Sequence, residues 1–299
     1  MTDSKPSMKI TKNQRKLIDT GLKIEETPPS PNDMAFNNAI LCQVGLPRSK
    51  VAEREFMRRC GDAWINVQAG YLDEGDNTPV AQPVPYGVTP RLTMAWITTY
   101  AKRHKTREIP TGNSAYEFLS LIGKSYAGTT LKNLRTQINA LAACRIQIGY
   151  QGRTFNGQPV EQFDAWINDN GIHGNYRWPG VMILSEGYFN ELERSAVPLD
   201  NRALEALGGS SLALDIYFWL AHRLYRISGK PVRVYWKNLR EQFGQEYTGK
   251  DSERSFKRKF KESLKQVLTV YPQARVELIT GGLSLKQSPP PIAQKCIND

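Results

Sequence analysis

The stretch DSERSFKRKFKESLKQVLTV, residues 251–270, has the pattern of an amphipathic helix with an apolar face and a basic face. At about 100° per residue, each face occupies one sector of the helix, and the two sectors adjoin. A solvated surface helix usually mixes both signs of charge in i,i+4 pairs, whereas only Glu262 interrupts this basic face. The apolar face holds Phe256, Phe260, Leu264, Val267 and Leu268, and the basic face holds Arg254, Lys257, Arg258, Lys261 and Lys265.

The basic face of this helix favours a nucleic-acid contact over two other interpretations that the residues leave open. One alternative is a plain solvated face, and the other is an amphipathic helix on a membrane surface. A strand predicted at residues 231–235 and a hairpin predicted around Gly281 and Gly282 embed the helix in a folded domain, which weighs against the membrane. We therefore expect the five basic side chains to bind DNA.

The segments around this helix predict a winged-helix domain, in which a helical DNA-binding unit ends in a β-hairpin. Hydrophobic periodicity and turn residues give the order helix, strand, helix, helix, hairpin. In chain order, the predicted elements are a helix over 210–226, a strand over 231–235, helices over 237–243 and 251–270, and a hairpin over 275–285.

The same order of elements is predicted a second time, earlier in the chain. Thr89 and Pro90 are typical of a helix start, and Asn113 is expected to cap the next helix. The sequence therefore predicts an α+β fold of two tandem winged-helix domains. The elements of the earlier domain are a helix after residue 89, an extended piece over 107–110, helices over 114–122 and 129–143, a strand over 145–150, and a hairpin or wing-like loop over 151–159.

The domain boundaries follow from composition and from these elements. Residues 1–85 are expected to form an N-terminal extension that is partly disordered, because residues 1–33 are polar and end in a Pro-rich run. Within it, alternation from Ala63 predicts a strand, and residues 73–85 are interpreted as a linker or long loop. The remaining regions are the first winged-helix domain over 86–178, the second over 179–290, and a tail over 291–299.

The helix predicted at residues 129–143 is the second candidate for reading DNA. Its apolar spacing buries one face, and the other face carries side chains of the types that bind phosphates and base edges. Arginine pairs with guanine and asparagine with adenine in the major groove. No Asp or Glu occurs between Glu117 and Glu161, which favours an anionic partner over an ordinary solvated face. The predicted contacts are Lys132, Arg135, Thr136 and Asn139.

The distribution of charge supports both assignments. The chain of 299 residues has 40 Lys and Arg against 29 Asp and Glu, which gives a formal net charge of +11. Residues 222–299 hold sixteen of the basic and seven of the acidic residues, so +9 of the +11 lies in the last quarter of the chain and +2 in the rest. Such asymmetry is typical of a nucleic-acid surface.

Five segments of the chain resemble the plasmid-encoded RepA family of replication initiators. Their order and spacing carry the resemblance, which covers about residues 85–290, and residues 199–224 are its most specific part. The segments are YGVTPRLTMAWITTYA, SLIGKSYAGTTLKNLRTQINALAACRIQI, VMILSEGYFNEL, VPLDNRALEAL and SSLALDIYFWLAHRLYRI.

The resemblance implies that the protein binds repeated sites on double-stranded DNA at a plasmid origin and contacts a host initiator and helicase. It leaves open whether the protein represses its own promoter and whether it is a monomer or a homodimer. The main alternative is a dimeric winged-helix transcription repressor. Two DNA-reading helices in one chain favour the initiator, since simple repressors usually obtain their second helix by dimerising. A relaxase or primase is a third interpretation.

The residues give little support for an enzyme, a cofactor or a metal site. There is no P-loop motif, and the three histidines, His104, His173 and His222, form no cluster for a metal-dependent nicking enzyme. The acidic residues at 73, 74 and 76 are interpreted as a solvated loop. Four cysteines without zinc spacing, no apolar segment of membrane-spanning length and no secretory signal lead us to expect a cytoplasmic protein.

Overall fold

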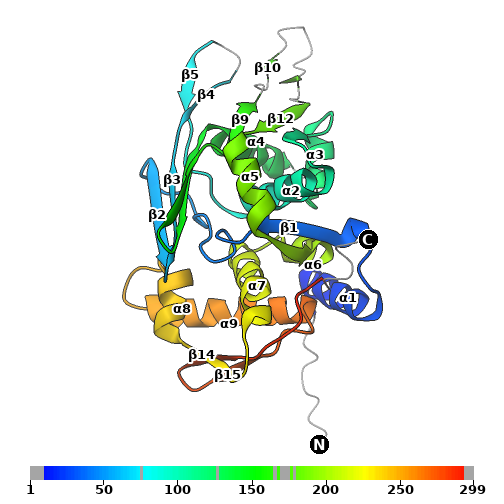
Figure 1. The fold of residues 1–299 in the computed structure, drawn as a ribbon, viewed down its shortest axis with the longest axis vertical. Coiled ribbons are helices and arrows are strands. Elements are labelled where there is room, and N and C mark those ends of the chain that lie inside the picture. Colours follow the sequence, from blue (N-terminus) through cyan, green and yellow to red (C-terminus); the bar gives the residue numbers. More distant parts are fainter. Residues whose placement is uncertain are drawn as a thin grey trace, which may run out of the picture.

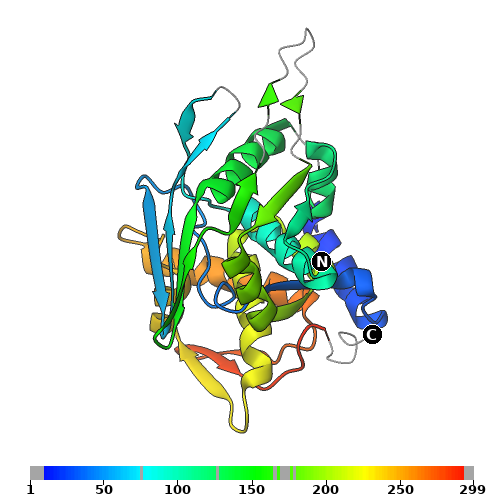
Figure 2. The ribbon, with the colours of Figure 1, turned by 45° about the horizontal axis from the view of Figure 1, so that its top comes forward.

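The computed structural model describes residues 10–74, 77–125, 128–163, 167, 168, 176, 177 and 180–292. The structure combines helices with antiparallel sheets, so the predicted α+β class is confirmed. Figure 1 shows an upper half built around helices α2 to α5 and a lower half built around α7, α8 and α9. A four-stranded sheet runs along one side of both halves, as Figure 2 shows from a second direction. The arrangement therefore places the two predicted DNA-reading helices, α4 and α9, in different halves.

The upper half contains a three-stranded antiparallel sheet in the order β6-β12-β9. Met182 pairs with Ile109 on one side and with Phe163 on the other, so β12 is the central strand. The sequence assigned residues 181–184 to the second domain, whereas in the structure β12 pairs with two strands from residues 86–178. The bounds are α2 Val88–His104, β6 Glu108–Pro110, α3 Ala115–Leu121, α4 Gly128–Ala143, β9 Val160–Phe163 and β12 Val181–Leu184.

The lower half repeats this order of elements. Its sheet has the order β14-β16-β15. The strand that comes third in sequence, β16, lies between the other two, as β12 does in the upper sheet. Two helices again separate the first strand from the second. The bounds agree with the sequence prediction to within a few residues: α7 Ser211–Arg223, β14 Val232–Tyr235, α8 Trp236–Phe243, α9 Ser252–Val270, β15 Val276–Ile279 and β16 Gly282–Leu285.

The segment before residue 85 is built into the molecule instead of forming a separate extension. β3 pairs with β7 over six residues, from Ala63 opposite Tyr150 to Gln68 opposite Arg145. The resulting sheet has the order β2-β3-β7-β8, and β1 pairs separately with β13. The sequence predicted a mobile arm over residues 1–33 and a tail over 291–299; residues 1–9 and 293–299 lie outside the described residues, and residues 12–26 form helix α1. The strands are β1 Met34–Asn38, β2 Glu55–Cys60, β3 Ala63–Gln68, β7 Arg145–Tyr150, β8 Arg153–Gly157 and β13 Ala196–Asp200.

The loop predicted as a hairpin or wing at residues 151–159 is a hairpin of the four-stranded sheet. Gln151 (φ +48°) and Gly152 (φ +83°) both adopt the left-handed conformation that a two-residue hairpin turn requires. In the upper half, it is β9 and β12 that pair beside β6, as β15 and β16 pair beside β14 in the lower half. The strand pair of the upper half that corresponds to β15 and β16 is therefore β9 and β12, and the β7–β8 pair lies between α4 and β9 in the chain.

Helix α1, Lys12–Glu26, packs on the lower half and contacts α9 and α6. A Cβ atom on Gly21 would lie 2.2 Å from the carbonyl oxygen of Thr269, so glycine allows the two helix backbones to approach closely. Helices α5, Glu186–Ser195, and α6, Asn201–Leu207, lie between the halves in sequence. The hydrophobic core is continuous from α2 to α9. The chain is thus one packed body in which two similar units share a core.

A buried cluster of charged residues joins the two halves. Arg91 of α2 donates to both carboxylate oxygens of Asp215 on α7, at 2.7 and 2.9 Å. Arg58 of β2 binds Glu246 at 2.7 Å, and burial lowers the pKa of Arg58 to about 10. Arg48 lies within 3.7 Å of Asp215 and 3.4 Å of Glu246. Because its members come from distant parts of the chain, this cluster fixes how the halves sit against each other.

Candidate nucleic-acid interface

Helix α9 is held by an aromatic cluster on the side that the sequence predicted to be apolar. Phe256 and Phe260 are fully buried, and their rings contact the Trp236 ring at centroid distances of 6.5 and 5.8 Å. The Phe260 ring also lies 5.5 Å from that of Phe243, at the end of α8. These contacts fix the rotation of α9 about its axis. The basic face of α9 must therefore point away from the core.

The basic face of α9 is exposed to solvent, except that Lys257 is partly covered. The Nζ atoms of Lys257 and Lys261 lie over the Trp236 ring, 6.0 and 5.6 Å from its centroid. This contact orients two of the long side chains at the surface. The structure therefore places all five predicted residues on one continuous cationic surface.

Counter-ions neutralise only part of this face. Lys257 pairs with Glu253 at 2.5 Å, and Arg258 pairs with Glu262 at 2.9 Å. Glu262 also binds Lys259 at 3.3 Å. Within the described part of the chain, Arg254, Lys261 and Lys265 have no carboxylate within 4.0 Å. These three cations are therefore available to an anionic partner without first breaking an ion pair.

A shallow groove of about 700 Å³ runs along the N-terminal half of α9. Lys250, in the turn before the helix, lines it together with four members of the basic face. Sequence reasoning missed Lys250 because it precedes the helix and does not belong to the helical pattern. The groove also contains Asp251 and Glu253, at the helix N-terminus, where carboxylates stabilise the helix dipole.

Helix α4 has the predicted apolar face, with Leu134, Ile138 and Leu141 buried. On its other face Lys132 is exposed, and Thr136 is partly covered. The Thr136 hydroxyl donates to the carbonyl oxygen of Lys132, one turn earlier, at 3.1 Å. The Lys132 ammonium and the Thr136 side chain are therefore accessible to a ligand.

The C-terminal half of the polar face of α4 is covered by a hairpin that the sequence interpreted as a linker. Strands β4, Tyr71–Asp73, and β5, Pro79–Ala81, form this hairpin, and β4 packs against α4. Glu74 lies 3.5 Å from Arg135 and accepts a 3.2 Å hydrogen bond from the Asn139 amide. The Gln82 amide donates to the same carboxylate at 2.9 Å. Glu74 thus places a negative charge beside Arg135, although the sequence between Glu117 and Glu161 contains no acidic residue.

The burial of Asn139 corrects the expectation that it lies on an open polar face. Its side chain is 2% exposed, because the β4–β5 hairpin and Glu74 lie over it. In this conformation Asn139 cannot reach a base edge. Arg135 remains at the surface, with 31% of its side chain exposed. Of the four residues that the sequence proposed on α4, Lys132 is the one that presents an exposed charge.

The structure brings no metal-binding group together among the residues that it describes. Of the acidic residues at 73, 74 and 76, Glu74 faces α4, and Asp76 falls outside the described residues, as does His173. His104 is exposed, and burial together with Arg226 and Arg223 lowers the pKa of His222 to about 3. In the described ranges, none of the helices combines the length and the apolar character needed to cross a membrane.

Both the sequence and the fold are similar to those of known proteins. A family model described as "Plasmid encoded RepA protein" matches residues 84–237, about half of the chain. Two crystal structures of domains 2 and 3 of RctB are similar in fold, with TM-scores of 0.51 and 0.50 and sequence identities of 13% and 14%. The matches cover 84% and 83% of this chain and 96% of each RctB chain. No curated protein matches the sequence.

Proposed function

Because this chain belongs to the family of plasmid-encoded RepA proteins, we propose that it is a plasmid replication initiator that binds repeated sites at its origin. The observation that carries the DNA-binding part of the proposal is the exposed basic face of α9, where three cations lack counter-ions among the described residues. A cationic helix face of this kind is the electrostatic footprint of a DNA-binding surface. The protein itself catalyses no step in this proposal, and it acts by recruiting the host's initiator and helicase.

Two winged-helix units would dock on one duplex. The repeated order of helix, strand, two helices and hairpin supports this assignment, as does the repeated strand order β6-β12-β9 and β14-β16-β15. In a helix-turn-helix unit, the second helix of the pair enters the major groove. That position belongs to α4 in the upper half and to α9 in the lower half.

The two helices would contribute differently to binding. The basic face of α9 and Lys250 would contact phosphates, which supplies affinity that depends on salt and is independent of sequence. On α4, Lys132 and Thr136 would contact DNA, and Arg135 would do so after releasing Glu74. Asn139 has no direct role in this proposal because it is buried.

The proposal is tested on the DNA that flanks the gene. We expect purified protein to protect several short direct repeats beside an A+T-rich stretch from nuclease cleavage. A plasmid that carries these repeats without the gene should replicate only when the protein is supplied from a second plasmid. Protection of a single inverted repeat, with no replication in the second assay, would instead identify a repressor.

A further inference from the structure

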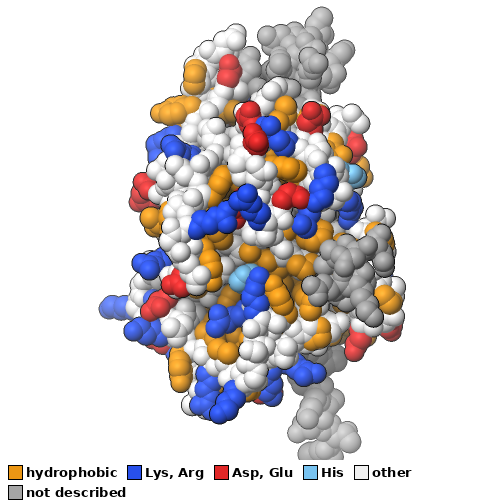
Figure 3. Space-filling view, in the orientation of Figure 1, with side chains coloured by type: hydrophobic (Ala, Val, Ile, Leu, Met, Phe, Trp, Pro, Cys, Tyr) orange, Lys and Arg blue, Asp and Glu red, His pale blue; other side chains and the backbone are white. Residues whose placement is uncertain are grey.

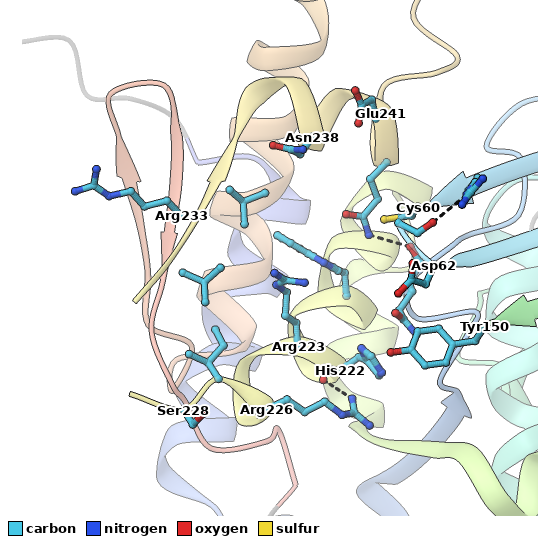
Figure 4. Close-up of a pocket in the computed structure, with 18 residues that line it drawn as sticks. Cys60, Asp62, Tyr150, His222, Arg223, Arg226, Ser228, Arg233, Asn238 and Glu241 are labelled. Atoms are coloured by element: carbon cyan, nitrogen blue, oxygen red, sulfur yellow. Dashed lines mark hydrogen bonds between the residues drawn. The ribbon is translucent and has the colours of Figure 1, made fainter. Parts of the chain in front are cut away.

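A cavity of about 840 Å³ lies between the ends of the four-stranded sheet and the lower half (Figure 4). Cys60, Asp62 and Tyr150, from the two hairpins of that sheet, line one side. The other side is formed by the end of α7, the turn that follows it, β14 and α8. Its volume is in the range of pockets that hold small ligands. No function described above makes use of this cavity.

The wall of the cavity has an excess of positive charge. Four arginines and two carboxylates line it, and among the described residues none of the four arginines has a carboxylate within 4.0 Å. Arg223 and Arg226 point toward the space in Figure 4, whereas Arg233 points outward at the rim. Arg226 is oriented by a 2.5 Å hydrogen bond to the carbonyl oxygen of His222. Two arginines without counter-ions are thus held beside one cavity.

The floor of the same cavity is apolar. Val232 and Val234 both line it, because alternate residues of β14 face the same side. Trp219 is 3% exposed and packs its ring 5.4 Å from that of Phe243. At the rim, Tyr150 is 40% exposed. Figure 3 shows hydrophobic side chains between the upper and lower halves on this face, with Lys and Arg side chains beside them.

The cavity is separate from the basic face of α9. No described residue of α9 lines it. Trp219 and His222 on α7 face the cavity, while α7 packs against the buried face of α9. DNA on α9 would therefore leave Arg223 and Arg226 uncovered. The two basic surfaces share no lining residue and could bind separate anionic partners.

We propose that this cavity docks an acidic peptide segment of a partner protein, with an apolar side chain as its anchor. The carboxylates of the segment would pair with Arg223 and Arg226, since arginine binds carboxylates with two parallel hydrogen bonds. The anchor would cover Val232 and Val234. A small anion alone would leave this apolar floor exposed, which is why the combination favours a peptide. Because the cavity spans both halves, the docked segment would contact the sheet and the lower half together.

The test uses a fluorescein-labelled peptide of sequence DEDELFEDE and the full-length protein. We expect saturable binding by fluorescence anisotropy in 50 mM salt, and binding about tenfold weaker in an Arg223→Ala/Arg226→Ala variant, which lacks two charge-assisted hydrogen-bonding groups. The matched control is Arg254→Ala/Arg258→Ala on α9, which removes the same charge and should bind the peptide like the parent protein. Equal weakening in both double variants would overturn the proposal, because it would indicate general charge attraction.

The anchor is tested with the peptide DEDESSEDE, which keeps the charge and lacks the apolar pair. It should bind at least about tenfold more weakly than DEDELFEDE, and equal binding would overturn the proposed apolar contact. The affinity of each peptide should be the same in the presence and in the absence of saturating DNA. Displacement of the peptide by DNA would contradict the separation of the two surfaces.

The location is tested through Cys60, whose thiol lies at the cavity. In a Cys296→Ser background, Cys42 and Cys144 remain but are buried, so iodoacetamide should label mainly Cys60. Saturating DEDELFEDE should slow this labelling severalfold. An unchanged labelling rate at saturation would place the peptide elsewhere. The substituted arginines are exposed, so the variants should fold like the parent protein. Circular dichroism of each variant checks this.

Discussion

Helices α4 and α9 occupy equivalent places in the two halves, but α9 presents more unpaired positive charge than α4. On α9, three basic side chains have no counter-ion among the described residues, and its two carboxylate partners are exposed at the helix surface. On α4, Glu74 comes from a hairpin 61 positions earlier and binds Arg135. The same order of elements thus yields one helix ready for an anion and another that is partly covered.

The difference shows that local charge counts do not determine which cations are free. Residues 118–160 contain no acidic residue, and yet the Glu74 carboxylate from a distant hairpin contacts α4. Residues 251–270 contain three acids, and yet three cations of α9 remain unpaired among the described residues. Three-dimensional packing decides the availability of a charge, and substitutions can change it separately on each helix.

The largest effect is expected from uncoupling the two halves that carry the helices. Asp215→Ala leaves Arg91, whose side chain is 3% exposed, without its carboxylate partner. Removing one partner of a buried ion pair costs about 3–5 kcal/mol of the free energy of unfolding. Chemical denaturation measures this loss. Lys105→Ala, in the exposed pair with Glu193, is the control and should cost less than about 1 kcal/mol; similar values for both variants would contradict a structural role for the buried cluster.

Acid should weaken the lower half through His222. Its pKa is lowered to about 3 in the folded protein, mainly by burial, so the unfolded chain binds the proton more readily between pH 3 and 6.5. Stability contributed by the neutral imidazole is therefore lost as pH falls below 6.5. Between pH 7 and pH 5, the free energy of unfolding should fall by about 2 kcal/mol more in the parent than in His222→Gln. His104→Gln, at an exposed site, should behave like the parent, and parallel pH profiles for the parent and His222→Gln would exclude a buried neutral imidazole.

Removing the negative charge beside α4 should increase the contribution of α4 to DNA binding. Glu74→Gln keeps the shape of the side chain and removes the charge that neutralises Arg135. We expect DNA affinity to rise severalfold and the slope of log K against log salt to steepen by up to about 0.9, the value for one additional bound phosphate. Titrations at several salt concentrations provide the measurement. An unchanged slope would mean that α4 does not approach the phosphates.

The corresponding substitution on α9 should have the smallest effect. Glu262→Gln frees Arg258 and Lys259, but Glu262 is exposed, and such pairs are weak in water. DNA affinity should rise about twofold, less than for Glu74→Gln, in the same titration. A larger gain in DNA affinity from Glu262→Gln than from Glu74→Gln would contradict the conclusion that α4 is the more neutralised of the two helices.

Short-range patterns in the sequence predict the lower half well. Residues 252–270 form the expected helix, and the strand at 232–235 and the hairpin around Gly281 and Gly282 lie where turn residues and alternation indicated. The five basic residues of α9 could be assigned to one surface because helical periodicity alone fixes their common face. Family membership also follows from segments whose order along the chain is visible without a structure.

Contacts between distant residues could not be predicted in this way. The pairing of β3 with β7 joins residues about 80 positions apart, and no local pattern indicates the partner of a strand. The same holds for Glu74 on α4 and for Arg91 with Asp215. Asn139 was misplaced for this reason, since its polar side chain suggested a surface position while a distant hairpin buries it.

Helix α9 is proposed to provide the principal electrostatic contact with DNA. The most direct test is the salt dependence of DNA binding by a variant with Arg254, Arg258, Lys261 and Lys265 all replaced by alanine. The control replaces four exposed basic residues outside both helices: Lys50, Arg59, Arg223 and Arg226.

In the α9 variant, the slope of log K against log salt should become shallower by up to about 0.9 for each phosphate that the helix no longer binds, and affinity should fall at least about a hundredfold at low salt. The control variant should keep the slope of the parent protein. Equal slopes for the parent and the α9 variant would contradict the assignment of this helix to DNA.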